Sequence, residues 1–176
     1  TEGKPSVVQV VGMNGHSEVE LLERAAAMES HSDHPLARAI LEYAKARGIS
    51  FTPAEDFGVL LGKGATARFD GRQFWLGSHR FLEERGQETP EVHDQLEALA
   101  KTGRSVVVVG NETHVCGFLA LADRIRPESR GSVDAMRKAG VEHVVMLTGD
   151  NQATAEAISK EAGITEVRAE LLPEDK

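Results

Sequence analysis

Two histidines three residues apart, His31 and His34, stand in the stretch ESHSDHPLARAI (29–40), just before a segment that begins with proline. A His–X–X–His spacing can place two imidazoles on one metal ion, and a histidine beside a helix start can also line a ligand pocket. The chain has seven histidines, but it has no cysteine cluster and no carboxylate at a matching spacing. The sequence therefore favours a surface or pocket histidine over a metal ligand.

A second candidate is Gly62-Lys63-Gly64, within LGKGA (61–65). Glycines without a Cβ let a backbone come close to a nucleotide. No Gly-Lys-Ser/Thr follows, so this is not a phosphate-binding P-loop, and a hairpin pattern rather than a helix follows, so it is not a Rossmann fingerprint. A plain loop before a hairpin is the alternative interpretation.

The third candidate is MLTGDN (146–151), which follows an apolar strand and precedes a helix. In open α/β sheets, ligands bind beyond the carboxyl ends of the strands. Backbone N–H groups at such a helix start, with the Thr148 hydroxyl, suit a phosphate. The alternative is an ordinary strand–turn–helix in which Asp150 or Asn151 is only the helix cap.

Composition excludes several classes of protein. The chain of 176 residues has 20 Lys and Arg against 28 Asp and Glu, a net charge of -8. This balance argues against sequence-independent nucleic-acid binding and against docking on an anionic membrane. The single cysteine, Cys116, excludes an internal disulfide framework and a Cys-rich zinc module. The longest small or apolar run, residues 115–122, is shorter than the roughly 18 residues of a membrane span.

The elements expected over residues 8–122 describe an α+β domain, with helix pairs packed on an antiparallel sheet. The β-branched run 6–11 predicts a strand, and Asp70-Gly71 predicts the turn of a hairpin over 65–77. A turn at Gly110-Asn111 is expected to join the last two strands. Apolar spacing and end signals predict helices over residues 17–30, 35–47, 78–86 and 91–102.

The pattern changes at residue 123. A helix from Pro127 to Gly140, a strand leading into 146–150, another helix and a short strand near 165–170 alternate as in a parallel α/β sheet. About two such repeats are present, which predicts only part of a doubly wound domain.

Read in order, these stretches resemble the cytoplasmic part of a heavy-metal-transporting P-type ATPase. The stretch at 29–40 resembles that subclass's Glu-X-X-Ser-X-His-Pro-Leu motif, and the segment DRIRP (123–127) resembles its Asp-X-X-Arg-Pro. TGDN (148–151) is also a family motif, and LLPEDK (171–176) resembles its Pro-X-X-Lys. The resemblance covers nearly the whole chain.

The resemblance implies a nucleotide-binding domain at 8–122 inserted into a phosphorylation domain of the haloacid-dehalogenase type, which would supply residues 1–7 and 123–176. In that family the phosphorylated aspartate would precede Thr1, and the segment that positions Mg²⁺ would follow Lys176. The chain is therefore expected to be part of a membrane pump, lying on the cytoplasmic face of the cell membrane and itself soluble and monomeric.

The resemblance also implies two sets of site residues. An adenine contact is expected at His34, with its ring beside the purine and Glu29 in the same pocket. Close backbone approach to the nucleotide is expected at Gly62, Gly64 and Gly77. Ser78 follows where the family often has asparagine, which puts its contact with the nucleotide in doubt. The phosphoryl-transfer residues implied are Thr148, Gly149, Asp150 and Lys176.

The implied partners are ATP or ADP, with Mg²⁺ at an incomplete site, and the phosphorylation, actuator and transmembrane domains of the same polypeptide. The parent would form an aspartyl-phosphate and export a transition metal, with zinc, cadmium or cobalt favoured over copper. The chain alone is expected to bind ATP or ADP weakly without turnover. Two alternatives remain, a stand-alone haloacid-dehalogenase-like phosphatase and a metal-binding module that uses His31, His34 and the other histidines.

Overall fold

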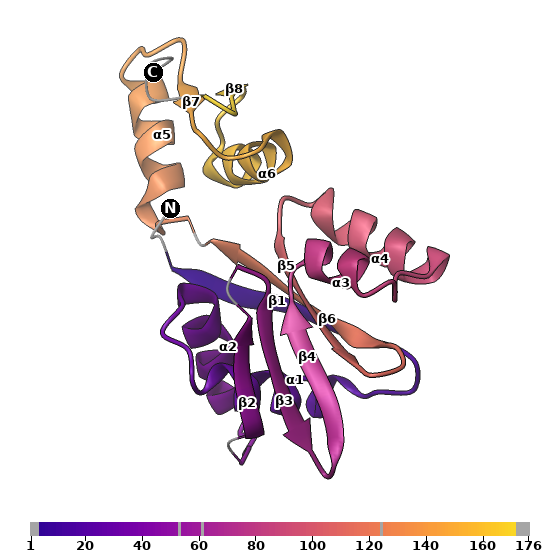
Figure 1. Ribbon diagram of the computed structural model, residues 1–176. Helices are drawn as coiled ribbons and strands as arrows, with labels where there is room; N and C mark the ends of the chain where they lie inside the picture. Colours follow the sequence, from indigo (N-terminus) through magenta and orange to yellow (C-terminus); the bar gives the residue numbers. More distant parts are fainter. Residues whose placement is uncertain (1–3, 53, 61, 124, 172–176) are drawn as a thin grey trace.

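The computed structural model describes residues 4–52, 54–60, 62–123 and 125–171. Residues 5–123 form a six-stranded sheet with helices, and residues 128–168 form a smaller α/β part set to one side of it (Figure 1). The expected fold, an antiparallel sheet flanked by helices and followed by a shorter α/β part, is confirmed. Within the described ranges, no helix has both the length and the hydrophobicity that crossing a membrane requires.

The large sheet has the strand order β1-β6-β5-β4-β3-β2, and each neighbouring pair is antiparallel. Its strands are β1 (Pro5–Gly12), β2 (Glu55–Leu60), β3 (Gly64–Phe69), β4 (Arg72–Gly77), β5 (Ser105–Asn111) and β6 (Val115–Asp123). Pro5 of β1 pairs with Asp123 of β6. Residues 5–7, which were expected to precede the nucleotide-binding domain, therefore lie in this sheet.

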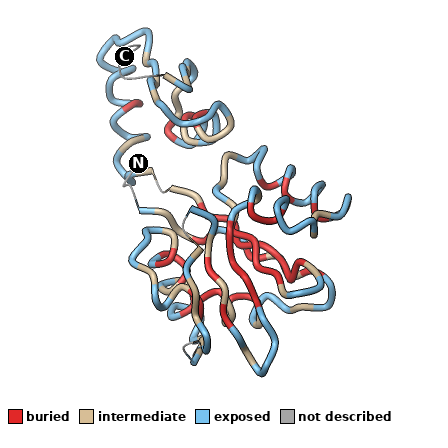
Figure 2. The backbone as a smooth tube through the Cα atoms, viewed as in Figure 1, coloured by how far each residue is buried: buried red, intermediate tan, exposed pale blue. Residues whose placement is uncertain are grey.

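Strand alternation divides the hydrophobic core between the two faces of the sheet. On β5, Val107 and Val109 pack on one face and Val108 packs on the other. Helices α1 (Glu18–Glu29) and α2 (Pro35–Ala46) cover the first face, and α3 (His79–Glu84) and α4 (Pro90–Ala100) cover the second. Because β5 and β6 are covered on both sides, their sequences are continuous apolar runs, and the buried positions of Figure 2 gather there.

The two hairpin turns differ in how well the sequence predicted them. Asp70 and Gly71 have φ of 50° and 77°, so both adopt the left-handed conformation that a two-residue hairpin turn requires, as expected. The turn expected at Gly110-Asn111 is wrong, because both residues still belong to β5. The Asn111 side chain makes the turn one step later, since its Oδ1 accepts the backbone N–H groups of Thr113 and His114 at 2.8 and 2.9 Å.

The smaller part consists of α5 (Glu128–Lys138), β7 (Val145–Leu147), α6 (Gln152–Ala162) and β8 (Glu166–Arg168). Strands β7 and β8 pair in parallel, as the strand–helix alternation predicted. Few of its side chains are buried, and Val145 and Leu147 are 42% and 45% exposed. It contacts the sheet part where the Thr154 hydroxyl donates to the Gly103 carbonyl at 3.1 Å.

Candidate functional site

One cavity of about 420 Å³ brings together residues that lie far apart in the sequence. A volume of this size falls within the roughly 300–1,000 Å³ of small-molecule sites. Three segments meet there: the end of α1 with the loop to α2, the turn from β2 to β3, and the end of β4. All six residues expected at a nucleotide site line it: Glu29, His34, Gly62, Gly64, Gly77 and Ser78.

His34 is fixed by its own helix. It is the N-cap of α2, and its Nδ1 accepts the backbone N–H of Leu36 at 3.2 Å. Pro35 follows at the first helical position, where its missing N–H leaves no helix bond unmade. Because Nδ1 is an acceptor, the neutral ring carries its proton on Nε2. The cavity therefore receives an exposed imidazole whose Nε2–H makes no hydrogen bond with the described residues.

Glu29 lies at the end of α1 and is partly buried on the cavity wall. Burial raises the pKa of its carboxyl group, and this effect outweighs a hydrogen bond with Ser32 and the nearby His34, which both lower it. Removal from water disfavours the charged carboxylate. A hydrogen-bond donor added at this position would stabilise the ionised form of Glu29.

Two of the cavity glycines, Gly64 and Gly77, allow two strands to approach closely. Gly64 and Gly77 are direct partners in the β3–β4 ladder. A Cβ on Gly64 would lie 1.9 Å from the Leu76 carbonyl oxygen, and one on Gly77 would lie 2.5 Å from the Lys63 carbonyl oxygen. The close packing of β3 against β4 is enough to require glycine at both positions, whether or not a ligand binds. The same close packing also places both residues at the cavity.

Ser78 lines the cavity, but its hydroxyl already has a local partner. It is the N-cap of α3 and its Oγ accepts the backbone N–H of Phe81 at 3.4 Å. A side chain in this role stabilises the helix start. The doubt that the sequence raised about Ser78 as a nucleotide contact therefore has a physical reason.

The sequence missed several residues of the cavity. Lys63 lies between the two glycines and forms an ion pair with Glu84, and it is the one lysine or arginine among the described residues that line the cavity. Phe57, Val106 and Val107 also line it. Lys63 could have been predicted, because it lies between two glycines that were themselves expected at the site. Phe57, Val106 and Val107 could not, because the sequence of an apolar strand does not distinguish a residue that lines a cavity from one in the hydrophobic core.

The two histidines of the opening motif separate in the structure. His31 does not line the cavity; it stacks on Phe57 with ring centroids 4.5 Å apart and an interplanar angle of 24°. In the described part of the chain, neither His31 nor His34 belongs to a group of three potential metal ligands. Their arrangement offers no support for a metal site built on His31 and His34.

The loop after β7 has a tight internal geometry. The Thr148 hydroxyl donates to Asp150 Oδ2 at 2.9 Å and accepts the Asp150 backbone N–H at 3.1 Å. Asn151, not Asp150, caps α6, because its side chain accepts the Thr154 N–H. Gly149, between Thr148 and Asp150, is exposed. Lys176, the fourth residue expected in phosphoryl transfer, lies outside the described residues.

This loop and the large cavity are separate. Thr148 and Gly149 line neither that cavity nor the hollow beside it, and Asp150 lines a hollow of about 320 Å³ together with Leu36 and Asp123. Leu36 lines both. The structure thus brings the six expected nucleotide-site residues together, while Thr148, Gly149 and Asp150 do not line their cavity.

The loop by itself does not fit Mg²⁺, which takes several oxygen ligands in near-octahedral geometry. Asp150 is the carboxylate that follows β7, and its Oδ2 already accepts the Thr148 hydroxyl. No group of three potential ligands within the described ranges includes Asp150. The Mg²⁺ that the family resemblance implies would need ligands beyond this loop.

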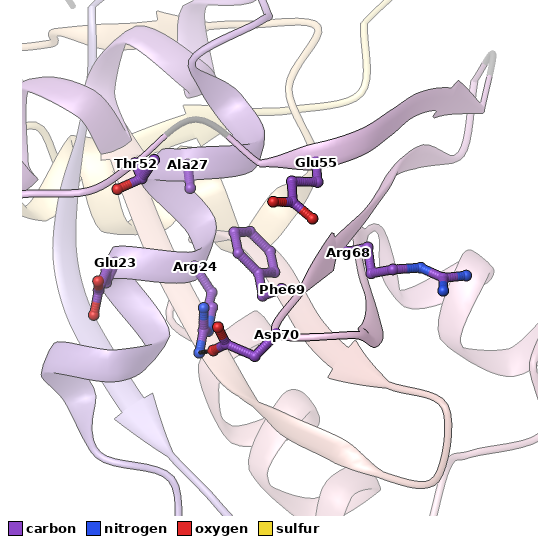
Figure 3. A pocket seen from close by; sticks show the side chains of 8 residues that line it. All are labelled: Glu23, Arg24, Ala27, Thr52, Glu55, Arg68, Phe69 and Asp70. Carbon is purple, nitrogen blue, oxygen red and sulfur yellow. Dashed lines mark hydrogen bonds and ion pairs between the residues drawn. The ribbon is translucent and has the colours of Figure 1, made fainter.

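A second hollow, of about 340 Å³, lies between α1 and the β2–β3 strands (Figure 3). Arg24 points across it, with one guanidinium nitrogen 3.5 Å from Asp70 and its carbon 4.6 Å from the centre of the Phe69 ring. The arginine is thus already engaged by a carboxylate and an aromatic face. None of the residues expected at a functional site lines this hollow, so we do not assign a ligand to it.

Comparison with known proteins identifies the family of the chain. The family model of the haloacid dehalogenase-like hydrolases matches residues 1–176. The chain belongs to the haloacid dehalogenase-like hydrolases. Its matches lie among the metal-transporting P-type ATPases, so the resemblance stated from the motifs is confirmed.

Three relatives illustrate the match. A copper-exporting P-type ATPase B from Archaeoglobus fulgidus is 41% identical over 176 residues, which are 100% of this chain and 25% of that protein. A probable cadmium-transporting ATPase from Staphylococcus aureus is 33% identical and covers 100% of this chain and 25% of its own length. The crystal structure of a zinc-transporting PIB-type ATPase superposes with a TM-score of 0.87 at 34% identity, covering 98% of this chain and 27% of that one.

The chain thus spans about a quarter of the length of the curated relatives it matches, 25% in both cases named. These relatives are ATPases, and ATPases are hydrolases. This agrees with the match of the chain to the haloacid dehalogenase-like hydrolases.

Proposed function

We propose that this chain binds ATP through its purine ring in the cavity lined by His34, and that it does so as part of a heavy-metal-transporting P-type ATPase. In the whole pump, residues 8–122 act as the nucleotide-binding domain and residues 123–176 belong to the phosphorylation domain. The observation that carries the proposal is the convergence of six motif residues from three distant segments on one cavity.

The chemistry of the cavity suits a nucleotide base. Leu36, Phe57 and Val107 provide an apolar lining for a flat ring. The His34 Nε2–H donor and the Glu29 carboxyl group provide the polar contacts that fix the orientation of a base. A base with both a ring acceptor and an exocyclic amino donor, as in adenine, matches this pair.

Affinity for the phosphates is expected to be weak. Lys63 is the cation that lines the cavity in the described part, and its ammonium group is already paired with Glu84. Phosphoryl transfer depends on positioning and charge stabilisation. In the pump, Thr148 would donate to the phosphoryl oxygens and Lys176 would neutralise their charge, while Asp150 would support the loop.

We propose that the chain by itself does not turn over ATP. An aspartyl-phosphate mechanism requires an aspartate nucleophile at the carboxyl end of a strand. Strand β1 contains no aspartate, and the Asp150 carboxylate after β7 accepts the Thr148 hydroxyl. Asp123 ends β6, but that strand belongs to the antiparallel sheet and not to the α/β part. The same observations disfavour a stand-alone phosphatase.

The cargo is proposed only as a transition-metal ion. The sequence favoured zinc, cadmium or cobalt, whereas the named relatives are a copper exporter, a cadmium transporter and a zinc transporter. Ion choice in such pumps depends on polar residues within the membrane helices, and none of the described helices crosses a membrane.

The test is titration of the isotopically labelled chain with a non-hydrolysable ATP analogue, followed by NMR, with adenosine as a second ligand. We expect His34→Ala and Glu29→Ala each to weaken binding about tenfold, a loss of about 1.4 kcal/mol. His31→Ala is the matched control and should change the dissociation constant less than twofold. Adenosine should perturb the same resonances as the ATP analogue.

Equal losses in the His31 and His34 variants would contradict a purine contact at His34. NMR shifts confined to residues 148–151, with none at residues of the cavity, would contradict binding through the purine ring. Steady-state ATP hydrolysis by the purified chain that survives Thr148→Ala would contradict the absence of turnover.

A further inference from the structure

Three potential metal ligands converge at the end of the sheet opposite the large cavity. They are His16 in the loop between β1 and α1, His114 in the turn between β5 and β6, and Cys116 on β6. Their ligand atoms all lie within 4.8 Å of one another. The cavity of the proposed function touches β5 at Val106 and Val107, whereas this cluster adjoins its other end at Asn111.

The backbone holds this cluster in place from two sides. The Met13 N–H donates to the Cys116 carbonyl at 2.8 Å, and the Asn14 side chain donates to the Val115 carbonyl at 2.8 Å. Asn14 and Gly15 both have positive φ, 52° and 85°, so the chain turns sharply just before His16. The histidine is therefore fixed beside β6 by a tight turn.

The hydrogen bonds around His114 determine which of its nitrogens accepts. Asn111 Oδ1 accepts two backbone N–H groups, so the amide nitrogen of Asn111 is the atom 3.3 Å from His114 Nε2. An amide nitrogen can only donate. His114 Nε2 is therefore an acceptor, and its Nδ1 carries the proton, 2.8 Å from Thr113 Oγ1.

The same reasoning applies to His16. Its Nδ1 lies 3.1 Å from a Glu20 carboxylate oxygen, which accepts, so Nδ1 carries a proton. In the neutral ring Nε2 is then also an acceptor. The two Nε2 atoms lie only 3.0 Å apart. The His114 lone pair also receives the Asn111 amide at 3.3 Å. The two ring nitrogens repel at this distance unless a proton lies between them, or unless a metal cation replaces the amide contact and the rings move apart slightly around it.

We propose that His16 Nε2, His114 Nε2 and Cys116 Sγ form a binding site for a zinc-like transition-metal ion, with its fourth position toward the adjoining hollow. That hollow, of about 310 Å³, is lined by both histidines and by Glu20. Tetrahedral Zn²⁺ with bonds of about 2.0–2.1 Å to nitrogen and 2.3 Å to sulfur sets its ligand atoms about 3.3–3.6 Å apart. The two Nε2 atoms, 3.0 Å apart, would have to separate by about 0.3 Å, and Cys116 Sγ, which lies within 4.8 Å of both, would have to move closer.

The outer contacts are those of a metal-binding histidine pair. A metal-bound imidazole commonly donates its other N–H to a carboxylate or another oxygen, which fixes the ring. Glu20 does this for His16, and Thr113 does it for His114. Two imidazoles and a thiolate form a donor set that suits zinc and copper rather than Mg²⁺ or Ca²⁺.

Binding must displace the thiol proton. Cys116 is 2% exposed, and burial raises the pKa of its thiol to about 12. The reaction therefore converts Cys–SH and Zn²⁺ into Cys–S–Zn and a proton released to solvent. Glu20 adds a negative charge beside the ion, and Arg24 lines the same hollow with a positive one.

A second cluster in the described part offers a contrast. Both His79 Nε2 and His93 Nδ1 lie 2.8 Å from the same Glu88 carboxylate oxygen. Each histidine there donates to an acceptor, so that cluster is satisfied without an ion. It serves as an internal control, because it contains imidazoles and a carboxylate but no sulfur.

The experiment is titration of the reduced, metal-free 176-residue chain with Co²⁺, followed by displacement with Zn²⁺. Because the chain has one cysteine, a thiolate-to-cobalt charge-transfer band in the near ultraviolet reports on Cys116 alone. We expect the band to saturate at one equivalent and to disappear when Zn²⁺ is added. Absence of the band in the unmodified chain would overturn the proposal without any variant.

Variants then identify the ligands. His16→Gln and His114→Gln should each weaken Zn²⁺ binding at least tenfold, and Glu20→Gln should weaken it about tenfold as a loss of outer support. His79→Gln and His93→Gln are matched controls that should leave both the band and the Zn²⁺ affinity unchanged. Cys116→Ser should abolish the band, with fluorescence of the buried Trp75 confirming that the variant is folded.

Zn²⁺ binding that is lost in His93→Gln but kept in His114→Gln would place the ion at the other cluster and overturn the proposal. The affinity of the chain for the ATP analogue should not change in His114→Gln. Failure of the metal site and failure of the proposed nucleotide site are therefore distinguishable.

Discussion

His34 serves two purposes, and Glu29 of the same motif lies beside it. His34 stabilises the start of α2 through Nδ1 and offers its other nitrogen to the cavity. Glu29 lies partly buried beside it, where burial disfavours its charge despite a hydrogen bond with Ser32 and the nearby His34. A residue kept at some cost to the folded state is typical of a binding site.

A prediction follows for Glu29→Gln. Burial raises the pKa of Glu29, so the folded state loses stability as pH rises from the unfolded to the folded pKa of this group, and the full loss remains at higher pH. Neutral glutamine removes this loss at pH 7. We expect a higher melting temperature by less than about 3 °C, corresponding to under about 1 kcal/mol in a chain of this size.

The same variant should bind the ATP analogue more weakly than the unmodified chain. Thermal melts by circular dichroism at pH 7 and at pH 4 test the stability effect, which should shrink at the lower pH because Glu29 is then protonated in both states. A lower melting temperature for Glu29→Gln at pH 7 would show that the carboxylate is stabilised by its neighbours.

At the scale of elements, the β3–β4 hairpin depends on close contact at its open end. Gly64→Ala would place a Cβ against the Leu76 carbonyl, whereas Gly62→Ala would meet no atom within 4 Å and would only strain a φ of 72°. We expect a loss of roughly 2–4 kcal/mol for Gly64→Ala and about 1 kcal/mol for Gly62→Ala. Urea unfolding followed by Trp75 fluorescence measures both, and equal losses would contradict the close approach of the two strands.

The connection between α3 and α4 should respond to pH. A hydrogen bond to Glu88 raises the pKa of His93, and hydrogen bonds from His79 and His93 lower the pKa of Glu88. The histidine's contribution is full below its unfolded pKa of about 6.5 and is lost as pH rises through the higher folded value. The glutamate's contribution is present above about pH 4.3 and is lost as pH falls through its lowered folded value.

The stability difference between the unmodified chain and His93→Gln should therefore be largest near pH 5.5 and should shrink by pH 8. Because both groups are close to solvent, the difference should be small and should decrease with added salt. His143→Gln, which removes another exposed histidine paired with a glutamate, is the control. It shows how much of the stability change comes from the loss of any exposed histidine–glutamate pair. A difference that grows toward pH 8 would contradict this assignment.

At the scale of the whole molecule, buried side chains are concentrated in the large sheet. Val108, Val109 and Phe118 in β5 and β6 are fully buried, whereas the described residues beyond 127 contribute mainly Val133, Ala155 and Ala162. Apolar burial is the main source of stability. The two parts should therefore differ in how readily they open.

Native-state hydrogen exchange tests this difference. Amides of β5 and β6 should exchange only with global unfolding, and amides of α5, β7 and β8 should have protection factors at least about tenfold lower, or about 1.4 kcal/mol. Amides of α1 serve as the reference for the sheet part. Equal protection in α5 and β6 would show that the two parts unfold as one cooperative unit.

Most elements were predictable because their signals are local. Ser17 accepts the Glu20 N–H at the start of α1, and Pro35 opens α2 at the expected position. Asp70 and Gly71 form the expected turn because few residues tolerate its positive φ values. The turn after β5 was misplaced because the side chain of Asn111, rather than a glycine, determines where the strand ends.

By itself, the sequence determined the family, through motifs with fixed residue types, and the fold class, through apolar periodicity. It also predicted six of the residues that line the cavity, because these residues belong to motifs that can be recognised from the sequence. Only the tertiary structure decided that Lys63, Phe57 and Val107 join them, that the Ser78 hydroxyl is used by α3, and that His16 meets His114 and Cys116. The physical reason is that these contacts join segments far apart in the sequence, so they depend on how strands and loops are placed beside one another, which the pattern of a single segment does not specify.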